Sequence, residues 1–122
     1  SRNFLRNGKF YERGINKMVK IPNEIKKVIL KFRTDIENDL KIKKIILFGS
    51  YAKGNYTENS DIDVCVIAEN VENGYLALLK IIPKVIESDV RIEPVVFSQN
   101  EYEIPLSFGL LKEVKKFGIE IN

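Results

Sequence analysis

The sequence predicts one α/β (α+β) domain in which helices cover a small mixed β-sheet. The first observation is size: 122 residues, 44% of them hydrophobic and 30% charged, is the usual material for one packed domain. The second is apolar residues at helical spacing, which predict amphipathic helices at 23–41, 74–88 and 107–117. The third is short apolar runs between them, which predict strands at 44–48, 61–68 and 90–97.

The first helix is expected to follow a segment of a different kind. Residues 1–18 show no apolar period, so we expect a flexible leader or an extension foreign to the domain. The alternative is that Phe4, Phe10 and Tyr11 pack against the domain or a neighbouring chain. The domain itself is then 19–122. Pro22 and Asn23 can open the first helix, with Asn23 as its cap.

Prolines and glycine mark the later elements. Pro83 is expected to kink or divide the helix at 74–88, and Pro94 makes 90–97 an edge strand or a bulged one. Gly118 suits the residue after the last helix, and the closing Ile-Glu-Ile is expected to be a strand or a tail.

Composition excludes several kinds of site. With one cysteine and no histidine, the chain has no internal disulfide, no Ser-His-Asp triad and no histidine-rich zinc site. A bound metal would need oxygen ligands, which points to Mg²⁺, Mn²⁺ or Ca²⁺. Cys65 lies between two valines and is expected in the core, with partial exposure possible. No apolar run approaches the ~20 residues that span a bilayer, and no secretory signal is evident, so we expect a cytoplasmic protein.

Two aspartates stand in an otherwise apolar strand. Asp61 and Asp63 are two residues apart and are expected on the same face of the strand at 61–68. Two close carboxylates repel each other unless a cation lies between them, and such a pair suits Mg²⁺ that holds phosphates. The alternative is a strand that begins in solvent, with Asp61 in a turn and Asp63 exposed.

A Gly-Ser pair favours the metal-site interpretation. Gly49 and Ser50 end the strand at 44–48, where a glycine allows close backbone approach and Ser50 can donate to phosphate oxygens. Gly54 lets the chain turn away. A phosphate-binding turn facing a carboxylate pair is the combination that nucleotidyl transfer requires.

The stretch "GSYAKGNYTENSDID" fits G-S-x10-D-x-D and resembles the DNA polymerase β-type nucleotidyltransferase superfamily, most closely its minimal nucleotidyltransferases (MNT). The resemblance implies the polymerase β-type fold, ATP as substrate and two Mg²⁺ ions. It also implies transfer of a nucleotide, AMP in our expectation, to a hydroxyl on a protein or RNA. Many such proteins are antitoxins beside a HEPN-family ribonuclease toxin, so a toxin of that family is the expected partner.

The resemblance also assigns residues. Asp61, Asp63 and Glu93 would be the catalytic, metal-binding carboxylates, with Asp89 as the competing third acid. Phosphate binding would fall to Gly49, Ser50 and Lys53. Charge neutralisation would fall to Lys53 or Arg91, with solvent exposure as the alternative for each, and base stacking to Tyr51 and Tyr56.

Two other functions compete with this one. The chain could be an antitoxin that acts only by binding its partner, or a small-molecule nucleotidyltransferase of the aminoglycoside type, which the short chain disfavours. The apolar residues of 75–86 and 105–111 offer more hydrophobic surface than is needed to cover a three-stranded sheet. We expect the remaining surface to contact a partner. A homo-oligomer is a further possibility.

Overall fold

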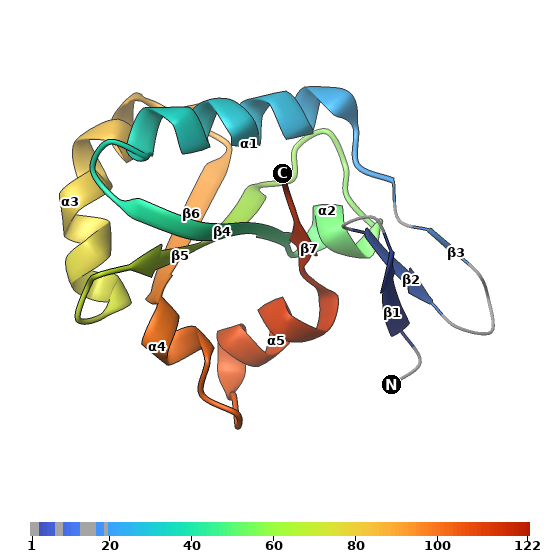
Figure 1. Cartoon of the computed structure of the whole chain (residues 1–122). Coiled ribbons are helices and arrows are strands. Elements are labelled where there is room, and N and C mark those ends of the chain that lie inside the picture. The colour runs from blue at the N-terminus through green and yellow to red at the C-terminus, as the bar shows by residue number, and fades with distance from the viewer. Residues whose placement is uncertain (1–2, 7–8, 13–16, 19) are drawn as a thin grey trace.

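A four-stranded mixed sheet forms the centre of the computed structural model, which describes residues 3–6, 9–12, 17–18 and 20–122 (Figure 1). A second, three-stranded sheet stands beside it. In chain order the elements are β1 (Asn3–Arg6), β2 (Lys9–Glu12), β3 (Lys17–Met18), α1 (Asn23–Ile36), β4 (Lys41–Phe48), α2 (Ser50–Lys53), β5 (Ile62–Glu69), α3 (Gly74–Glu87), β6 (Ile92–Ser98), α4 (Gln99–Tyr102), α5 (Gly109–Phe117) and β7 (Ile119–Glu120).

The central sheet has the strand order β6-β5-β4-β7. β4 pairs antiparallel with β5, β5 pairs parallel with β6, and β7 pairs antiparallel with β4. β6 is therefore an edge strand, as Pro94 predicts, and the closing Ile-Glu is a strand rather than a tail. The three predicted strands are confirmed, although β4 begins at Lys41 because its lysine-rich first half pairs without being buried.

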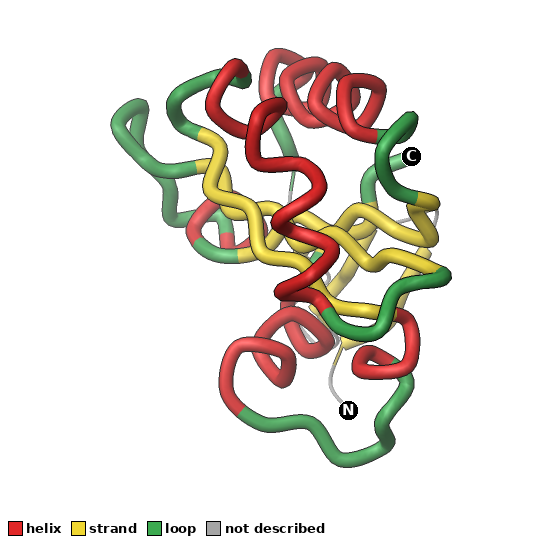
Figure 2. Tube along the Cα trace, turned by 90° about the vertical axis from the view of Figure 1, so that its left-hand side faces the viewer, coloured by secondary structure: helices red, strands yellow, loops and turns green. Residues whose placement is uncertain are grey.

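Helices cover both faces of this sheet. α1 and α3 pack on one face, where Ile62, Val64 and Val66 join their side chains in the larger core. Figure 1 shows α1 above the sheet and α4 and α5 below it, and Figure 2, seen from the side of α3, shows that helix lying across the strands. On the α5 face, Val114 packs with Cys65 in a smaller cluster. The predicted fold class is confirmed.

α1 is shorter than predicted. It ends at Ile36 instead of residue 41, because Glu37 closes the helix and a turn follows; Leu40 is still buried. Its N-cap is Pro22 and not Asn23, and no side chain caps it. The Pro22 carbonyl accepts from the amides of Ile25 and Lys26 instead.

α3 runs unbroken through Pro83, so of the two predicted effects of this proline, division of the helix is wrong, while a kink stays a prediction. Pro83 lies on the exposed side of α3, where water can reach the carbonyl that loses its partner. Asn73 caps the start of the helix by accepting from the Leu76 amide at 2.9 Å. The helix buries Ala77 and Ile81.

The C-terminal part contains a helix that periodicity did not predict. α4 is one short turn, stabilised by a capping box in which Ser98 and Glu101 each accept from the other's backbone amide. α5 begins at Gly109, two residues later than expected. Gly118 ends it without a left-handed conformation, and the reason for glycine is space, since a Cβ there would overlap the Val114 carbonyl and the Ile46 side chain.

The described parts of the predicted leader are extended. β1, β2 and β3 form an antiparallel sheet, and β2 lies against β7. Residues 1–2, 7–8, 13–16 and 19 lie outside the described part of the chain, and the proposed division at residue 19 stays a prediction. Among the described residues, every helix is too short or too polar to cross a bilayer.

Candidate active site

The Gly49-Ser50 turn lies at the end of β4, where the strand passes directly into α2. Gly49 has φ +72° and Gly54 has φ +82°, so the turn is entered and left through conformations that favour glycine. The amides of Lys53 and Gly54 bond back to Gly49 and Ser50 at 3.0 Å. The predicted turn after the first strand is confirmed as a single helical turn between two glycines.

Gly49 also lies against Asp63. Phe48 pairs with Asp63 across β4 and β5, which brings the turn to the start of β5. A Cβ on Gly49 would overlap Asp63 Oδ2 and lie 3.0 Å from its Cγ. A larger residue at position 49 would therefore displace the Asp63 carboxylate, as well as block the close backbone approach that glycine allows.

The predicted carboxylates approach one another at the same edge of the sheet. Asp63 is in direct parallel register with Glu93, so both side chains are on the α5 face. Asp61 precedes β5 instead of belonging to it, and both Asp61 and Glu93 are exposed. Burial, followed by the charges of Glu93, Asp61 and Glu113, raises the pKa of Asp63. Three other carboxylates therefore lie close enough to Asp63 to repel its negative charge.

This donor set suits a divalent cation in its chemistry. Carboxylate oxygens are the ligands that Mg²⁺ prefers, and a cation would relieve the repulsion that, after burial, raises the pKa of Asp63. The side chains are not gathered into a finished site, because within the described residues no three acidic, cysteine or histidine side chains are close enough to hold a metal. Metal binding by Asp61, Asp63 and Glu93 therefore stays a prediction.

Asp89, the competing third acid, is occupied elsewhere. Its carboxylate accepts from the Arg91 amide at 2.9 Å and from the guanidinium Nε and Nη2 at 3.1 and 3.0 Å. These bonds to Arg91 lower the pKa of Asp89. Arg91 Nη2 also lies 3.6 Å from Glu24 Oε1. Both side chains are thus engaged at the turn before β6, whereas Glu93 is the acid in register with Asp63.

Lys53 contacts a helix that the sequence does not connect with it. Its Nζ lies 3.3 Å from Glu113 Oε1 and 5.2 Å from the ring centroid of Phe117, both on α5. Glu113 is the residue of this region that sequence reasoning missed. It stands in an ordinary amphipathic helix sixty residues from Lys53, and no local motif marks it.

Comparison with known proteins agrees with this geometry. Residues 15–118 match the nucleotidyltransferase domain family. The chain belongs to this family. A Methanocaldococcus jannaschii protein named "putative protein adenylyltransferase" is 34% identical over 103 residues, which cover 80% of this chain and 99% of the relative. A second protein of that name and organism is 46% identical over 57 residues, about half of either chain.

Solved nucleotidyltransferase structures share the fold. A crystal structure of a Sulfolobus solfataricus chain described as a "putative nucleotidyltransferase" superposes with a TM-score of 0.57 at 16% identity, covering 80% of this chain and 79% of that one. A toxin-antitoxin complex, MntA-HpeT, superposes with a TM-score of 0.50 at 25% identity, covering 80% of this chain and 72% of that one. The resemblance to the polymerase β-type superfamily is confirmed.

The two tyrosines expected to stack on a base, Tyr51 and Tyr56, stack on each other in this nucleotidyltransferase. The rings of Tyr51 and Tyr56 are 4.4 Å apart and 18° from parallel. Tyr51 is buried in the larger core, so its ring is not available to a nucleotide base in this arrangement. Tyr56 keeps an exposed side and stays the candidate for base stacking.

Cys65 is a core residue, as expected, but it has no exposed part. Its side chain is fully buried on the α5 face. Burial raises the pKa of the thiol to about 12. At neutral pH it is therefore protonated and enclosed, which excludes it as the nucleophile of a nucleotidyltransferase reaction.

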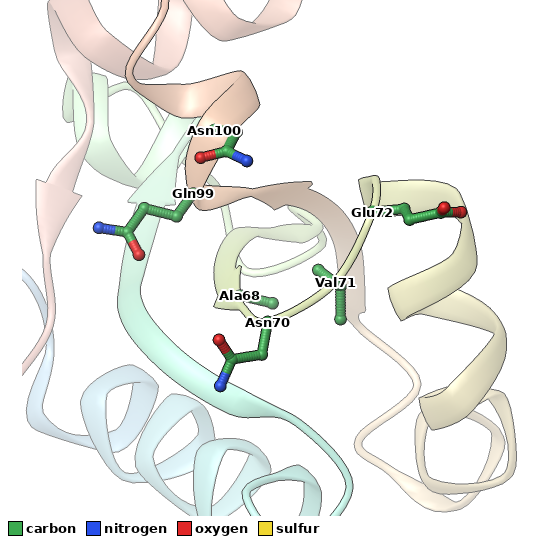
Figure 3. Close-up of a pocket in the computed structure, with 6 residues that line it drawn as sticks. All are labelled: Ala68, Asn70, Val71, Glu72, Gln99 and Asn100. Atoms are coloured by element: carbon green, nitrogen blue, oxygen red, sulfur yellow. The ribbon is translucent and has the colours of Figure 1, made fainter.

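A pocket of about 500 Å³ lies at the opposite end of β5 and β6 from the carboxylates. Gln99 and Asn100 enter it from α4 and Asn70 from the loop after β5, while the Glu72 carboxylate points away from these amides (Figure 3). Because Ala68 at its base is five residues beyond Asp63 along β5, the pocket has no part in the carboxylate site.

Proposed function

We propose that the chain transfers AMP from ATP to a hydroxyl on a protein partner, and that the partner is a HEPN-family toxin which this chain neutralises. The observation that carries the proposal is the meeting of the Gly49-Ser50 turn with Asp63, which is itself in register with Glu93. A phosphate-binding turn and paired carboxylates then face the same substrate. The name of the Methanocaldococcus jannaschii relative supports adenylyl transfer.

Each residue has a role in this proposal. Ser50 and the amides near Gly49 bind the β- and γ-phosphates, and the Lys53 ammonium offsets their charge. Asp61, Asp63 and Glu93 would hold two Mg²⁺ ions, which supply charge stabilisation at the phosphates and lower the pKa of the acceptor hydroxyl when bound. If no protein hydroxyl accepts the AMP, a hydroxyl of RNA is the alternative acceptor.

The reaction is an in-line displacement at the α-phosphorus. The acceptor oxygen forms a bond to that phosphorus as the bond to the bridging oxygen breaks, and pyrophosphate leaves. The hydroxyl proton passes to the Glu93 carboxylate and from there to solvent. Glu93 is exposed, which leaves it accessible to both.

Exposed apolar side chains support a protein partner. On α3, Tyr75 is 69% and Ile86 77% exposed, and near α5 Leu106 is 69% and Phe108 74% exposed. Exposed apolar side chains that gather into a patch often mark protein–protein interaction sites. The MntA-HpeT neighbour is a toxin-antitoxin complex, and its crystallised variant replaces two aspartates, two positions apart, by glutamate. That spacing is the one between Asp61 and Asp63.

A binding-only antitoxin is the second candidate. One observation favours it, namely that no three acidic side chains of the described residues are gathered to hold a metal. A small-molecule nucleotidyltransferase has no comparable support, since the described pocket of about 500 Å³ lies away from the carboxylates.

Co-expression with a HEPN-family toxin, followed by intact-mass measurement of the toxin, separates these functions. We expect a mass increase by whole AMP units that disappears with Asp61→Asn, while Asp35→Asn on α1 leaves it unchanged. A complex that silences the toxin equally well with Asp61→Asn and adds no mass would leave only the binding function. Absence of any complex would contradict both.

A further inference from the structure

The direction of the Lys53 side chain is decided by α5. Lys53 belongs to α2, directly after the Gly49-Ser50 turn, yet the two contacts of its ammonium described above come from Glu113 and Phe117. These two residues are four apart, so they share one side of α5. A lysine without such contacts samples many rotamers. Here the last helix of the domain restricts the lysine of the phosphate-binding turn.

Glu113 lies on the helix that covers the face of the sheet carrying Asp63. Its neighbour Val114 packs with Phe48 and Cys65, which fixes α5 against the face that carries Asp63. The charge of Glu113 is also close enough to Asp63 to contribute to the raised pKa of that carboxyl. α5 therefore contacts Lys53 and also places a carboxylate charge near Asp63.

The pair contributes little to the stability of the fold. The Lys53 and Glu113 side chains are 37% and 36% exposed, and ion pairs of that kind are weak because water screens them. An ammonium has three donors, so Lys53 can keep its bond to Glu113 and still donate to a phosphate oxygen. These properties suit a contact that orients a ligand-binding group.

We propose that Glu113 is a positioning residue, whose carboxylate holds the Lys53 ammonium beside the Gly49-Ser50 turn where the β- and γ-phosphates bind. This inference rests on the proposed function, since it requires a nucleoside triphosphate at the turn. It adds a residue from α5 to a site otherwise built from β4, α2, β5 and β6.

The test separates nucleotide affinity from the transfer rate. Calorimetry with α,β-methylene ATP and Mg²⁺ should give a dissociation constant about two- to five-fold weaker for Glu113→Gln. Lys53→Met should weaken binding about ten- to hundred-fold, because it removes a charge-assisted bond to phosphate. The double variant should bind no more weakly than Lys53→Met, since Glu113 acts through Lys53. The rate of AMP addition to the toxin at saturating ATP should be unchanged by Glu113→Gln.

Two controls show whether position or mere pairing matters. Asp35→Asn breaks another exposed pair, Lys31–Asp35 at 3.1 Å on α1, and should leave affinity unchanged. Exchange of the charges, Lys53→Glu with Glu113→Lys, restores an ion pair between α2 and α5 without a cation at the turn. Affinity should then stay as weak as in Lys53→Met, and a return to the wild-type value would overturn the proposal.

Other results also count against it. Glu113→Gln with unchanged or tighter nucleotide binding would mean that the carboxylate does not guide Lys53 or competes with phosphate for it. A slower saturating rate with unchanged affinity would place Glu113 in the chemical step instead. A wild-type chain that neither binds the ATP analogue nor modifies the toxin would overturn the proposed function, and this inference with it. An active wild type indifferent to Glu113→Gln would overturn this inference alone.

Discussion

The two faces of β5 carry out different tasks within one strand. Toward α1 and α3 the strand presents Ile62, Val64 and Val66, all fully buried in the larger core. Toward α5 it presents the charged Asp63 and then Cys65, which belongs to the smaller apolar cluster. Because neighbouring residues of a strand point to opposite faces, the core side can stabilise the fold while the other side holds charges that repel.

The largest expected effect breaks the core face. Phe32 on α1 is 1% exposed and packs with the strands of the central sheet. Phe32→Ala removes a large buried ring and should lower the free energy of unfolding by about 3–5 kcal/mol. Urea denaturation followed by circular dichroism measures this. A loss below about 1 kcal/mol would mean that this face is less well packed than the structure indicates.

Asp63→Asn tests the other face without harming the fold. Because the carboxylate of Asp63 is a proposed metal ligand, its removal should abolish transfer, a loss of at least about 3 kcal/mol of transition-state stabilisation. The free energy of unfolding should stay the same or rise when no metal is present. Activity and denaturation measured on the same preparation decide the matter. Loss of both together would show that Asp63 is needed for folding.

A smaller effect is expected at the Gly49-Ser50 turn, where we propose that the phosphates bind. Ser50→Ala should weaken ATP binding by about 1.5–3 kcal/mol, the value of a hydrogen bond to a charged group. Ser107→Ala is the matched control, because the Ser107 hydroxyl is buried and has no hydrogen-bond partner among the described residues. It should leave ATP affinity unchanged and leave the fold equally or more stable. Equal affinities for wild type and Ser50→Ala would place the phosphates elsewhere.

The smallest effect concerns two aspartates whose pKa values move in opposite directions. The pKa of Asp89 is lowered by Arg91, so Asp89 stabilises the fold above its ordinary pKa of about 3.9, and this contribution is lost as the pH falls through the lowered value. The pKa of Asp63 is raised, chiefly by burial, so its relative contribution is greatest at low pH and is lost as the pH rises through the raised value.

Thermal melts of the apo protein at several pH values compare the two. At pH 7, Asp89→Asn should lower the melting temperature, and the difference from wild type should shrink toward acid. Asp63→Asn should raise the melting temperature at pH 7, and that difference should also shrink toward acid. Shifts of the same sign at pH 7 would contradict the opposite environments of the two carboxyls.

Much of this protein follows from local pattern alone. The alternation of apolar runs predicted the order of the main helices and strands, and the spacing from Gly49-Ser50 to Asp61 and Asp63 predicted the family, because these signals depend on neighbours along the chain. The exposure of Glu93 was also predictable from the sequence, because it alternates with Ile92, which is buried in the core. The close backbone approach at Gly49 was also predicted from the sequence.

Tertiary structure decided what distant segments do to one another. Only the pairing of β4 with β5 shows that Gly49 lies against the Asp63 carboxylate, and only the packing of α5 brings Glu113 to Lys53. The continuity of α3 through Pro83 depends on which side of the helix faces water. Tyr51, expected to be available to a base, is taken up by the core and by Tyr56. Each of these outcomes is a contact between residues whose sequence separation carries no signal, so the free energy of packing determines them and the local pattern does not.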